Sequence, residues 1–303
     1  MLSLKGSKKI AVFVDKDCKT MKDPEYIYIT EKENKNRLQT TEDNKQRIFR
    51  SFLELNKKIR KIDIDRLVYA YANNDILQDD KFGRLYDDAS QHVNDSLEKY
   101  MSCHDSFLMP VIDFSISKRI YVTGASGSGK STWLSHLLSL NRGKKQAIFF
   151  FSPFKDEGLY GLKNIIDVDM SEFEAENERE FAEEDIMPGS ICVFDDIESH
   201  KTHKKALIEL RNIILQRGRH ENVSCITVSH NPMQGVSTKD SLRECSYYCM
   251  FKNNERDVTH LLKGYCNFNQ KMVDDVLSQD TRYIFISKDV PKYYITNHSI
   301  KLL

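Results

Sequence analysis

The sequence predicts an α/β fold in which a mainly parallel sheet is covered by helices. From residue 118 onward, short runs rich in β-branched and aromatic residues alternate with helical stretches, which is typical of a sheet buried on both faces. A glycine-rich loop follows the first of these runs, and a pair of aspartates ends the third. The expected strands are Arg119–Val122, Gln146–Phe151, Ser190–Phe194, Ser224–Ser229 and Tyr247–Phe251.

Helices are expected between and after these strands. Ser171 followed by acidic residues predicts a helix start with a serine N-cap, and residues 204–216 place apolar side chains at helical spacing. A C-terminal hairpin is expected at the edge of the sheet, from Tyr283–Ser287 and Tyr293–Thr296. The expected helices are Lys130–Leu140, Ser171–Glu184, Lys204–Gln216, Asp257–Gly264 and Gln270–Ser278.

We expect the chain to divide into a small α+β N-terminal region of unknown role, residues 1–114, and a domain built around the glycine-rich loop, residues 115–303. Lys9–Val14 and Tyr26–Thr30 are expected as strands, and residues 31–45 as a flexible link because they are polar and lack an apolar period. Residues 46–62 form an amphipathic stretch with a basic face. That face either contacts phosphates or is the solvated side of a packed helix.

Composition narrows the class of protein. The 303 residues include forty-five basic and forty-five acidic ones, so the chain has no net charge. This argues against a protein that coats nucleic acid through its overall electrostatic field, but it is compatible with a local basic face or with a ring pore. The chain has no apolar run long enough to cross a bilayer, so we expect a soluble intracellular protein. Seven scattered cysteines indicate reduced thiols. A weaker alternative is a metal site formed by Cys245, Cys249, His260 and Cys266. The spacing of these four residues fits zinc poorly.

The glycine-rich loop matches the phosphate-binding pattern G-x-x-x-x-G-K-[ST] directly after an apolar strand and before a helix. Its backbone amides and the positive end of the following helix are expected to hold a nucleoside triphosphate, with Lys130 on the β- and γ-phosphates and Ser131 on Mg²⁺. The alternative is an accidental glycine/serine turn, which the preceding strand disfavours. The expected nucleotide-binding residues are Gly124, Ala125, Ser126, Gly127, Ser128, Gly129, Lys130, Ser131 and Thr132.

The strand Ser190–Phe194 leads into Asp195 and Asp196, the acids expected beside such a loop. Asp195 is predicted to help hold Mg²⁺, and Asp196 to polarise the attacking water. Glu198 is a weaker substitute for Asp196. The competing interpretation is a buried strand followed by a helix N-cap aspartate.

Two further groups are candidates for catalysis. His230 or Asn231, after the strand Ser224–Ser229, is the candidate sensor of the γ-phosphate, because ligands lie at the carboxyl ends of parallel strands. The alternative is a plain Asn-Pro turn. Arg217 or Arg219 is predicted to reach the γ-phosphate of a neighbouring subunit, unless these cations only stabilise a helix C-terminus.

The ordered segments GASGSGKST, ICVFDD and RGRHENVSCITVSH resemble the genome-packaging ATPases of large double-stranded DNA viruses and virophages, the poxvirus-type branch of the FtsK/HerA superfamily. The similarity covers roughly residues 115–255. That family usually ends the sensor strand with glutamine, where this chain has His230.

The resemblance implies a RecA-like core, Mg-ATP, a homo-oligomeric ring and double-stranded DNA threaded into a preformed capsid. It also implies capsid or portal-vertex partners, and a place in the host-cell cytoplasm, the viral factory or the virion. The alternatives are a related DNA translocase or helicase, a small-molecule kinase with the same loop, and a nucleotide-dependent assembly switch.

Overall fold

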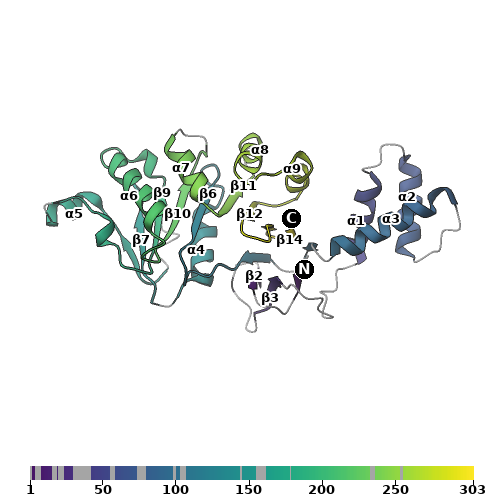
Figure 1. Cartoon of the computed structure of the whole chain (residues 1–303), viewed down its shortest axis with the longest axis horizontal. Helices are drawn as coiled ribbons and strands as arrows, with labels where there is room; N and C mark the ends of the chain where they lie inside the picture. The colour runs from purple at the N-terminus through teal and green to yellow at the C-terminus, as the bar shows by residue number, and fades with distance from the viewer. Residues whose placement is uncertain are drawn as a thin grey trace.

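A computed structural model describes most of the chain. A sheet domain and a separate helical unit lie next to each other along the long axis of the molecule (Figure 1). None of the helices in the described part of the chain combines the length and apolar character needed to cross a bilayer. The described residues are 2–3, 8–15, 19, 24–29, 42–54, 59–73, 80–97, 100–102, 107–143, 145–154, 162–177, 179–232, 236–252 and 255–303.

The larger sheet has ten strands in the order β4-β14-β13-β12-β11-β6-β10-β9-β7-β8. The six strands from β11 to β8 run parallel, and the four at the other end are antiparallel. The parallel strands are β6 (Arg119–Thr123), β7 (Ile148–Phe151), β8 (Ile165–Asp167), β9 (Ile191–Asp195), β10 (Ser224–Ser229) and β11 (Tyr247–Phe251). The antiparallel ones are β4 (Tyr100–Ser102), β12 (Tyr283–Ser287), β13 (Tyr293–Thr296) and β14 (Ser299–Leu302).

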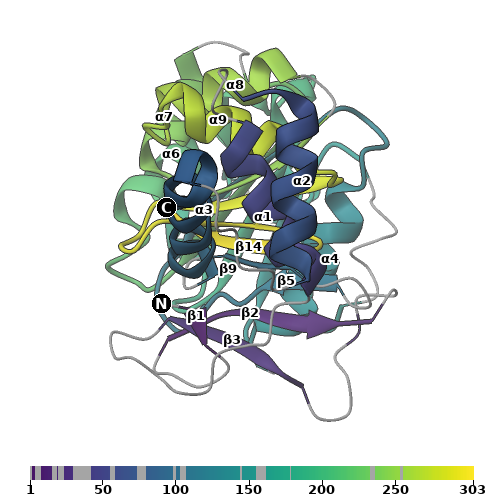
Figure 2. The ribbon, with the colours of Figure 1, turned by 90° about the vertical axis from the view of Figure 1, so that its right-hand side faces the viewer.

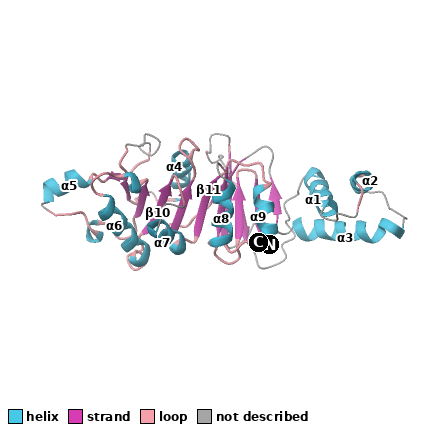
Figure 3. Cartoon of the chain, turned by 90° about the horizontal axis from the view of Figure 1, so that it is seen from above, coloured by secondary structure: helices cyan, strands magenta, loops and turns pink. Residues whose placement is uncertain are grey.

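Alternate residues of the central strands point to opposite faces, so each face has its own core. Ile120 and Val122 of β6 belong to one buried cluster and Tyr121 to the other. Helix α4 (Lys130–Asn141) covers the first face, while most of the other helices cover the second (Figure 3). The latter are α6 (Lys204–Arg217), α7 (Val236–Glu244), α8 (Glu255–Gly264) and α9 (Gln270–Leu277).

A small antiparallel sheet, order β1-β3-β2-β5, lies below the larger one (Figures 1 and 2). Its apolar side chains join those of α4 and the large sheet in a single buried cluster. The Tyr283 hydroxyl of β12 donates a hydrogen bond to the Leu108 carbonyl of β5 at 2.6 Å. Its strands are β1 (Leu2–Ser3), β2 (Lys8–Val14), β3 (Tyr26–Ile29) and β5 (Phe107–Pro110). The boundary at residue 114 remains a prediction.

The helical unit consists of α1 (Glu42–Glu54), α2 (Lys61–Ala72) and α3 (Asp80–Leu97), and it has its own buried cluster. Residues 42–45, predicted as part of the link, form the first turn of α1, and the described remainder of 46–62 is split between two helices. On the basic face, Arg50 pairs with Asp65 of α2 at 2.8 Å, which favours a packed helix. The predicted link over residues 31–41 lies outside the described residues.

The predicted acidic helix is shorter than expected. Helix α5 spans Met170–Asn177, and a separate 3-10 turn, η1, spans Glu183–Asp185. The prediction of Ser171 as the N-cap was wrong, because the Asp169 carboxylate accepts hydrogen bonds from the Ser171 and Glu172 amides at 2.9 and 3.2 Å. Strand β7 also begins two residues later than predicted, since the Gln146 side chain bonds the Phe114 and Gly189 carbonyls before the strand starts.

The five cysteines in the described residues are buried free thiols: Cys192, Cys225, Cys245, Cys249 and Cys266. Within the part of the chain that the structure describes, no group of three or more histidine, cysteine, aspartate or glutamate side chains is arranged to hold a metal ion, so the alternative of a cysteine–histidine metal site is not supported. Cys18 and Cys103 lie outside the described residues.

Candidate nucleotide site

The glycine-rich loop joins β6 to α4 at the carboxyl edge of the parallel strands. Gly124 is required by close packing, since a β-carbon there would lie 2.6 Å from Phe251 Cβ. Gly129 has a φ of +101°, a conformation that favours glycine, and it begins α4 without a capping side chain. The first turn of α4 also contains no acidic residue. The positive end of the helix is therefore available to an anion.

Lys130 lies under this loop and its ammonium group is fully engaged. Nζ donates to the carbonyls of Gly124 and Ala125 at 2.7 and 3.0 Å and lies 3.0 Å from His230 Nδ1. Because an ammonium cannot accept, Nδ1 must be the acceptor, and a neutral imidazole then carries its proton on Nε2. Burial lowers the pKa of Lys130, and the negative charges of Asp195 and Asp196 oppose that shift.

His230 links Lys130 to the acid pair. Its Nε2 lies 3.7 Å from Asp196 Oδ2, across the end of β10. Asp196 follows β9 in a left-handed conformation, φ 49°, and its amide donates to the Val228 carbonyl at 3.1 Å. This turn directs Asp196 toward β10 and His230. Lys130, Asp196 and His230 therefore form one cluster, although they come from three segments of the chain.

Asn231 has a different environment. Its amide donates to Ser229 Oγ at 3.3 Å, and that hydroxyl donates to the Asn231 carbonyl at 3.0 Å. These bonds describe a closed turn after β10. His230, the other sensor candidate, contacts the loop lysine.

Ser131 and Asp195 are the residues predicted to hold Mg²⁺. Ser131 is in the first turn of α4, and Asp195 is the last residue of β9. Hydroxyl and carboxylate oxygens are the donors that this hard cation prefers. Among the described side chains, the buried Ser128 hydroxyl in the same loop has no hydrogen-bond partner. A buried donor of this kind suits a phosphate oxygen.

Comparison with known proteins agrees with this site. Residues 114–290 match the family described as "Poxvirus A32 protein". The chain belongs to the poxvirus A32 protein family. This confirms the resemblance seen in the motifs, and with it the prediction of a P-loop ATPase of the viral genome-packaging type.

The chain is also similar to a virophage protein. The chain is 30% identical over 195 residues to "Uncharacterized protein V3" of Sputnik virophage, covering 61% of this chain and 76% of that protein.

Two solved structures are more distantly similar. The genome packaging NTPase B204 of Sulfolobus turreted icosahedral virus 2, in complex with sulfate, has a TM-score of 0.41 at 12% identity, covering 61% of this chain and 96% of that one. The cytoplasmic domain of the Type VII secretion ATPase EccC of Thermomonospora curvata has a TM-score of 0.42 at 16% identity, covering 62% of this chain. The chain spans only 27% of that EccC domain.

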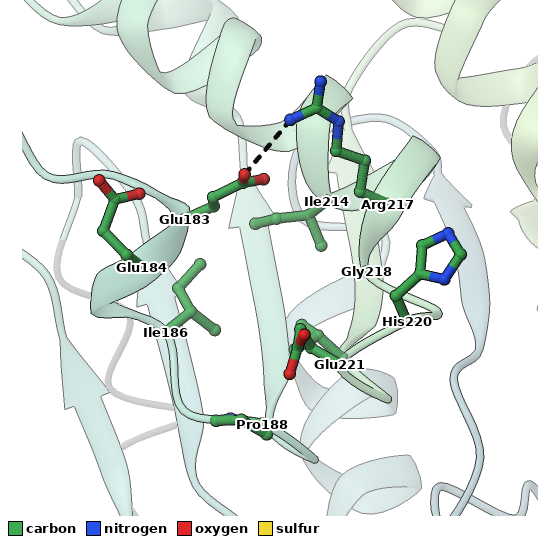
Figure 4. Close-up of a pocket in the computed structure, with 10 residues that line it drawn as sticks. Glu183, Glu184, Ile186, Pro188, Ile214, Arg217, Gly218, His220 and Glu221 are labelled. Carbon is green, nitrogen blue, oxygen red and sulfur yellow. Dashed lines mark hydrogen bonds and ion pairs between the residues drawn. The ribbon is translucent and has the colours of Figure 1, made fainter.

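In this A32-family chain, Arg217 and Arg219 lie at the other end of the sheet's strands from the phosphate loop. Arg217 ends α6 and Arg219 lies in the turn that follows it, before β10, so both are at the amino edge of the parallel strands, opposite the phosphate loop. Arg217 lines a cavity of about 630 Å³ there and forms an ion pair with Glu183 at 3.4 Å (Figure 4). Arg219 is exposed, and none of the described carboxylates pairs with it. Neither arginine lies at the sheet edge that carries the phosphate loop of its own chain.

Glu198, the weaker candidate for water activation, is occupied elsewhere. Its Oε1 accepts a hydrogen bond from Arg211 at 2.7 Å, and the Arg211 side chain is completely buried. This pairing favours Asp196 as the acid beside the nucleotide.

Removal of Glu198 is expected to destabilise the fold. A Glu198→Ala variant leaves the buried Arg211 charge without its carboxylate, so unfolding free energy should fall by about 3–5 kcal/mol. The matched control is Glu209→Ala, since Glu209 pairs with Lys205 in solvent at 3.9 Å and such pairs contribute about 1 kcal/mol or less. Urea unfolding measures both, and equal losses would contradict this assignment.

Two residues beside the loop were not singled out from the sequence. Phe251 ends β11 against Gly124, and Arg282 precedes β12 near Gly129. The available signal was the predicted hairpin: an antiparallel strand starts at the edge where its parallel neighbours end. The sequence alone does not show that β12 lies next to β11, so it could not place Arg282 beside the loop.

Proposed function

We propose that this protein is the ATP-driven motor that moves double-stranded DNA into a preformed viral capsid. The observation that carries the proposal is the cluster of Lys130, His230 and Asp196 at the mouth of the phosphate loop, in a chain of the A32 family. Membership of the family indicates an ATPase. The cluster would provide the groups that bind a triphosphate and activate water.

Triphosphate binding must change the contacts of Lys130. All three ammonium donors are engaged, two by loop carbonyls and one by His230. A phosphate oxygen therefore displaces at least one of them, and the His230 contact is the one made by a side chain that can turn away. His230 would then respond to the presence of the terminal phosphate. We propose His230, and not Asn231, as the sensor.

Asp196 is proposed to orient the water that attacks the γ-phosphate in line with its leaving group. Its carboxylate lies beside His230 and is only partly exposed, so it can accept a proton from bound water. Lys130 would neutralise charge that develops on the phosphate oxygens. Mg²⁺, held by Ser131 and Asp195, would supply electrostatic stabilisation of the same charge when bound.

A homo-oligomeric ring completes the site in this proposal. The two candidate arginines lie at the sheet edge opposite their own phosphate loop, so they can act only on a neighbour. Arg219 is the better candidate, because Arg217 already faces Glu183 in its own chain. The ring would enclose double-stranded DNA, dock on capsid or portal-vertex proteins, and operate in the host cytoplasm or viral factory.

The test is assembly and turnover with defined ligands. We expect negative-stain images of the protein with ATPγS and duplex DNA to show rings, and ATP turnover to rise with duplex DNA but not with free nucleosides. Lys130→Ala is the control, because it removes triphosphate binding and should abolish both responses. A persistent monomer whose turnover rises with a nucleoside would overturn the motor in favour of a kinase.

A further inference from the structure

Arg282 reaches the phosphate loop because of the direction of β12. This strand runs antiparallel to β11, and Tyr283 pairs with Phe251, the last residue of β11. The residue before β12 therefore lies at the carboxyl edge of the parallel strands, where β6 enters the loop. A β-carbon built on Gly129 would lie 3.6 Å from Arg282 Cζ and 3.7 Å from its Nε and Nη2.

The backbone of Arg282 is fixed while its guanidinium is available. Its amide donates to Asn297 Oδ1 at 3.3 Å, and its carbonyl accepts from the Lys252 amide at 3.4 Å. The nearby Lys252 ammonium is already bound to the Leu277 and Gln279 carbonyls, both at 2.6 Å. In contrast, no carboxylate in the described part of the chain forms an ion pair with Arg282, and its side chain is exposed.

The position of Arg282 along the loop indicates which part of a nucleotide it faces. The strand order is β12-β11-β6-β10-β9, so Arg282 is on one flank of the loop and the His230–Asp196 pair is on the other. A triphosphate with its terminal phosphate beside His230 and Asp196 extends its inner phosphates toward the opposite flank. A guanidinium there presents a planar fork of donors that matches phosphate oxygens.

We propose that Arg282 binds the α- and β-phosphates of the nucleotide held in its own subunit. This inference rests on the proposed function, but the role differs from that of Arg219, which would act on a neighbour and on the terminal phosphate. ATP and ADP share the inner phosphates, so Arg282 would stabilise the bound substrate and the transition state equally. It sets affinity for nucleotide and leaves the rate of the chemical step unchanged.

The test compares nucleotide affinity with turnover in Arg282→Ala. We expect the dissociation constants for ADP and for ATPγS to rise together by about 10–100-fold, the loss typical of a hydrogen bond to a charged group. KM for ATP should rise similarly while kcat is unchanged. Arg282→Lys should recover part of the affinity, because it keeps the charge but loses the fork. Arg243→Ala is the matched control, since Arg243 is exposed on α7 at the opposite edge of the sheet.

The outcomes separate this inference from the motor proposal. If Lys130→Ala loses nucleotide while Arg282→Ala binds ADP as the wild type does, the role of Arg282 is overturned and the ATPase stands. A fall in kcat with unchanged ADP affinity also overturns it, because the arginine would then act in the chemical step. If the wild-type protein binds neither ADP nor ATPγS, both proposals fail.

Discussion

An Asp196→Asn variant is expected to bind ATP with wild-type affinity and to hydrolyse it about 10²–10⁴-fold more slowly, the usual contribution of a general base. The amide keeps the shape of the side chain but cannot accept a proton from water. The left-handed turn at Asp196 and its contact with His230 at 3.7 Å should be retained, since both depend on position and not on basicity. Equilibrium binding of ATPγS and steady-state DNA-stimulated turnover measure the two effects separately.

The matched control for this variant is Asp240→Asn. Asp240 is an exposed residue of α7 that takes no part in the cluster of Lys130, Asp196 and His230, and its replacement should leave turnover unchanged. Normal turnover in Asp196→Asn would remove Asp196 from the chemical step. Loss of ATPγS binding in the same variant would show that the acid supports the nucleotide and not the water.

Arg219→Ala is expected to reduce turnover of assembled rings by about 10³–10⁵-fold, as loss of an arginine finger does in other nucleoside triphosphatases. Nucleotide binding by each subunit should be unchanged, because Arg219 lies at the edge of the sheet opposite its own phosphate loop. Arg217→Ala is the matched comparison: it removes the neighbouring cation, which already pairs with Glu183, and should have a smaller effect.

Mixed rings show whether Arg219 acts on a neighbour. Subunits with Arg219→Ala keep an intact nucleotide site, and subunits with Lys130→Ala keep the arginine but lose the site. Each variant alone should be inactive, whereas a mixture should recover part of the turnover wherever the two kinds of subunit adjoin. A mixture as inactive as its components would indicate that the arginine serves its own chain or only stabilises the end of α6.

The sequence predicted the central strands well because their signals are local. Strands β10 and β11 have the bounds expected from their unbroken apolar and β-branched runs, and every residue of both is buried. The phosphate loop was equally readable, since its glycines and Lys130 are consecutive. The proximity of Lys130, Asp196 and His230 followed from a general rule, that the carboxyl ends of parallel strands share one edge.

Other features depend on contacts that no local pattern contains. The acidic residues after Asn177 have helical composition, yet Asp185 bonds Arg179 and the Ala182 amide, and the segment turns there. Glu198 resembles a catalytic acid in sequence, but it neutralises a buried arginine thirteen residues later. Arg282 had no motif around it, and only the antiparallel register of β12 brings it to the loop.

The shared cluster of the small sheet and α4 bears on how the protein folds. Trp133, two residues after Ser131, lies 5.7 Å from the Tyr283 ring and in the same buried group as Ile10, Val12 and Leu108. The helix that presents amides to phosphate is therefore held from behind by strands near the start of the chain. Synthesis of the nucleotide-binding half alone would leave this apolar surface in water, so the amino-terminal strands and the phosphate loop form one cooperative folding unit.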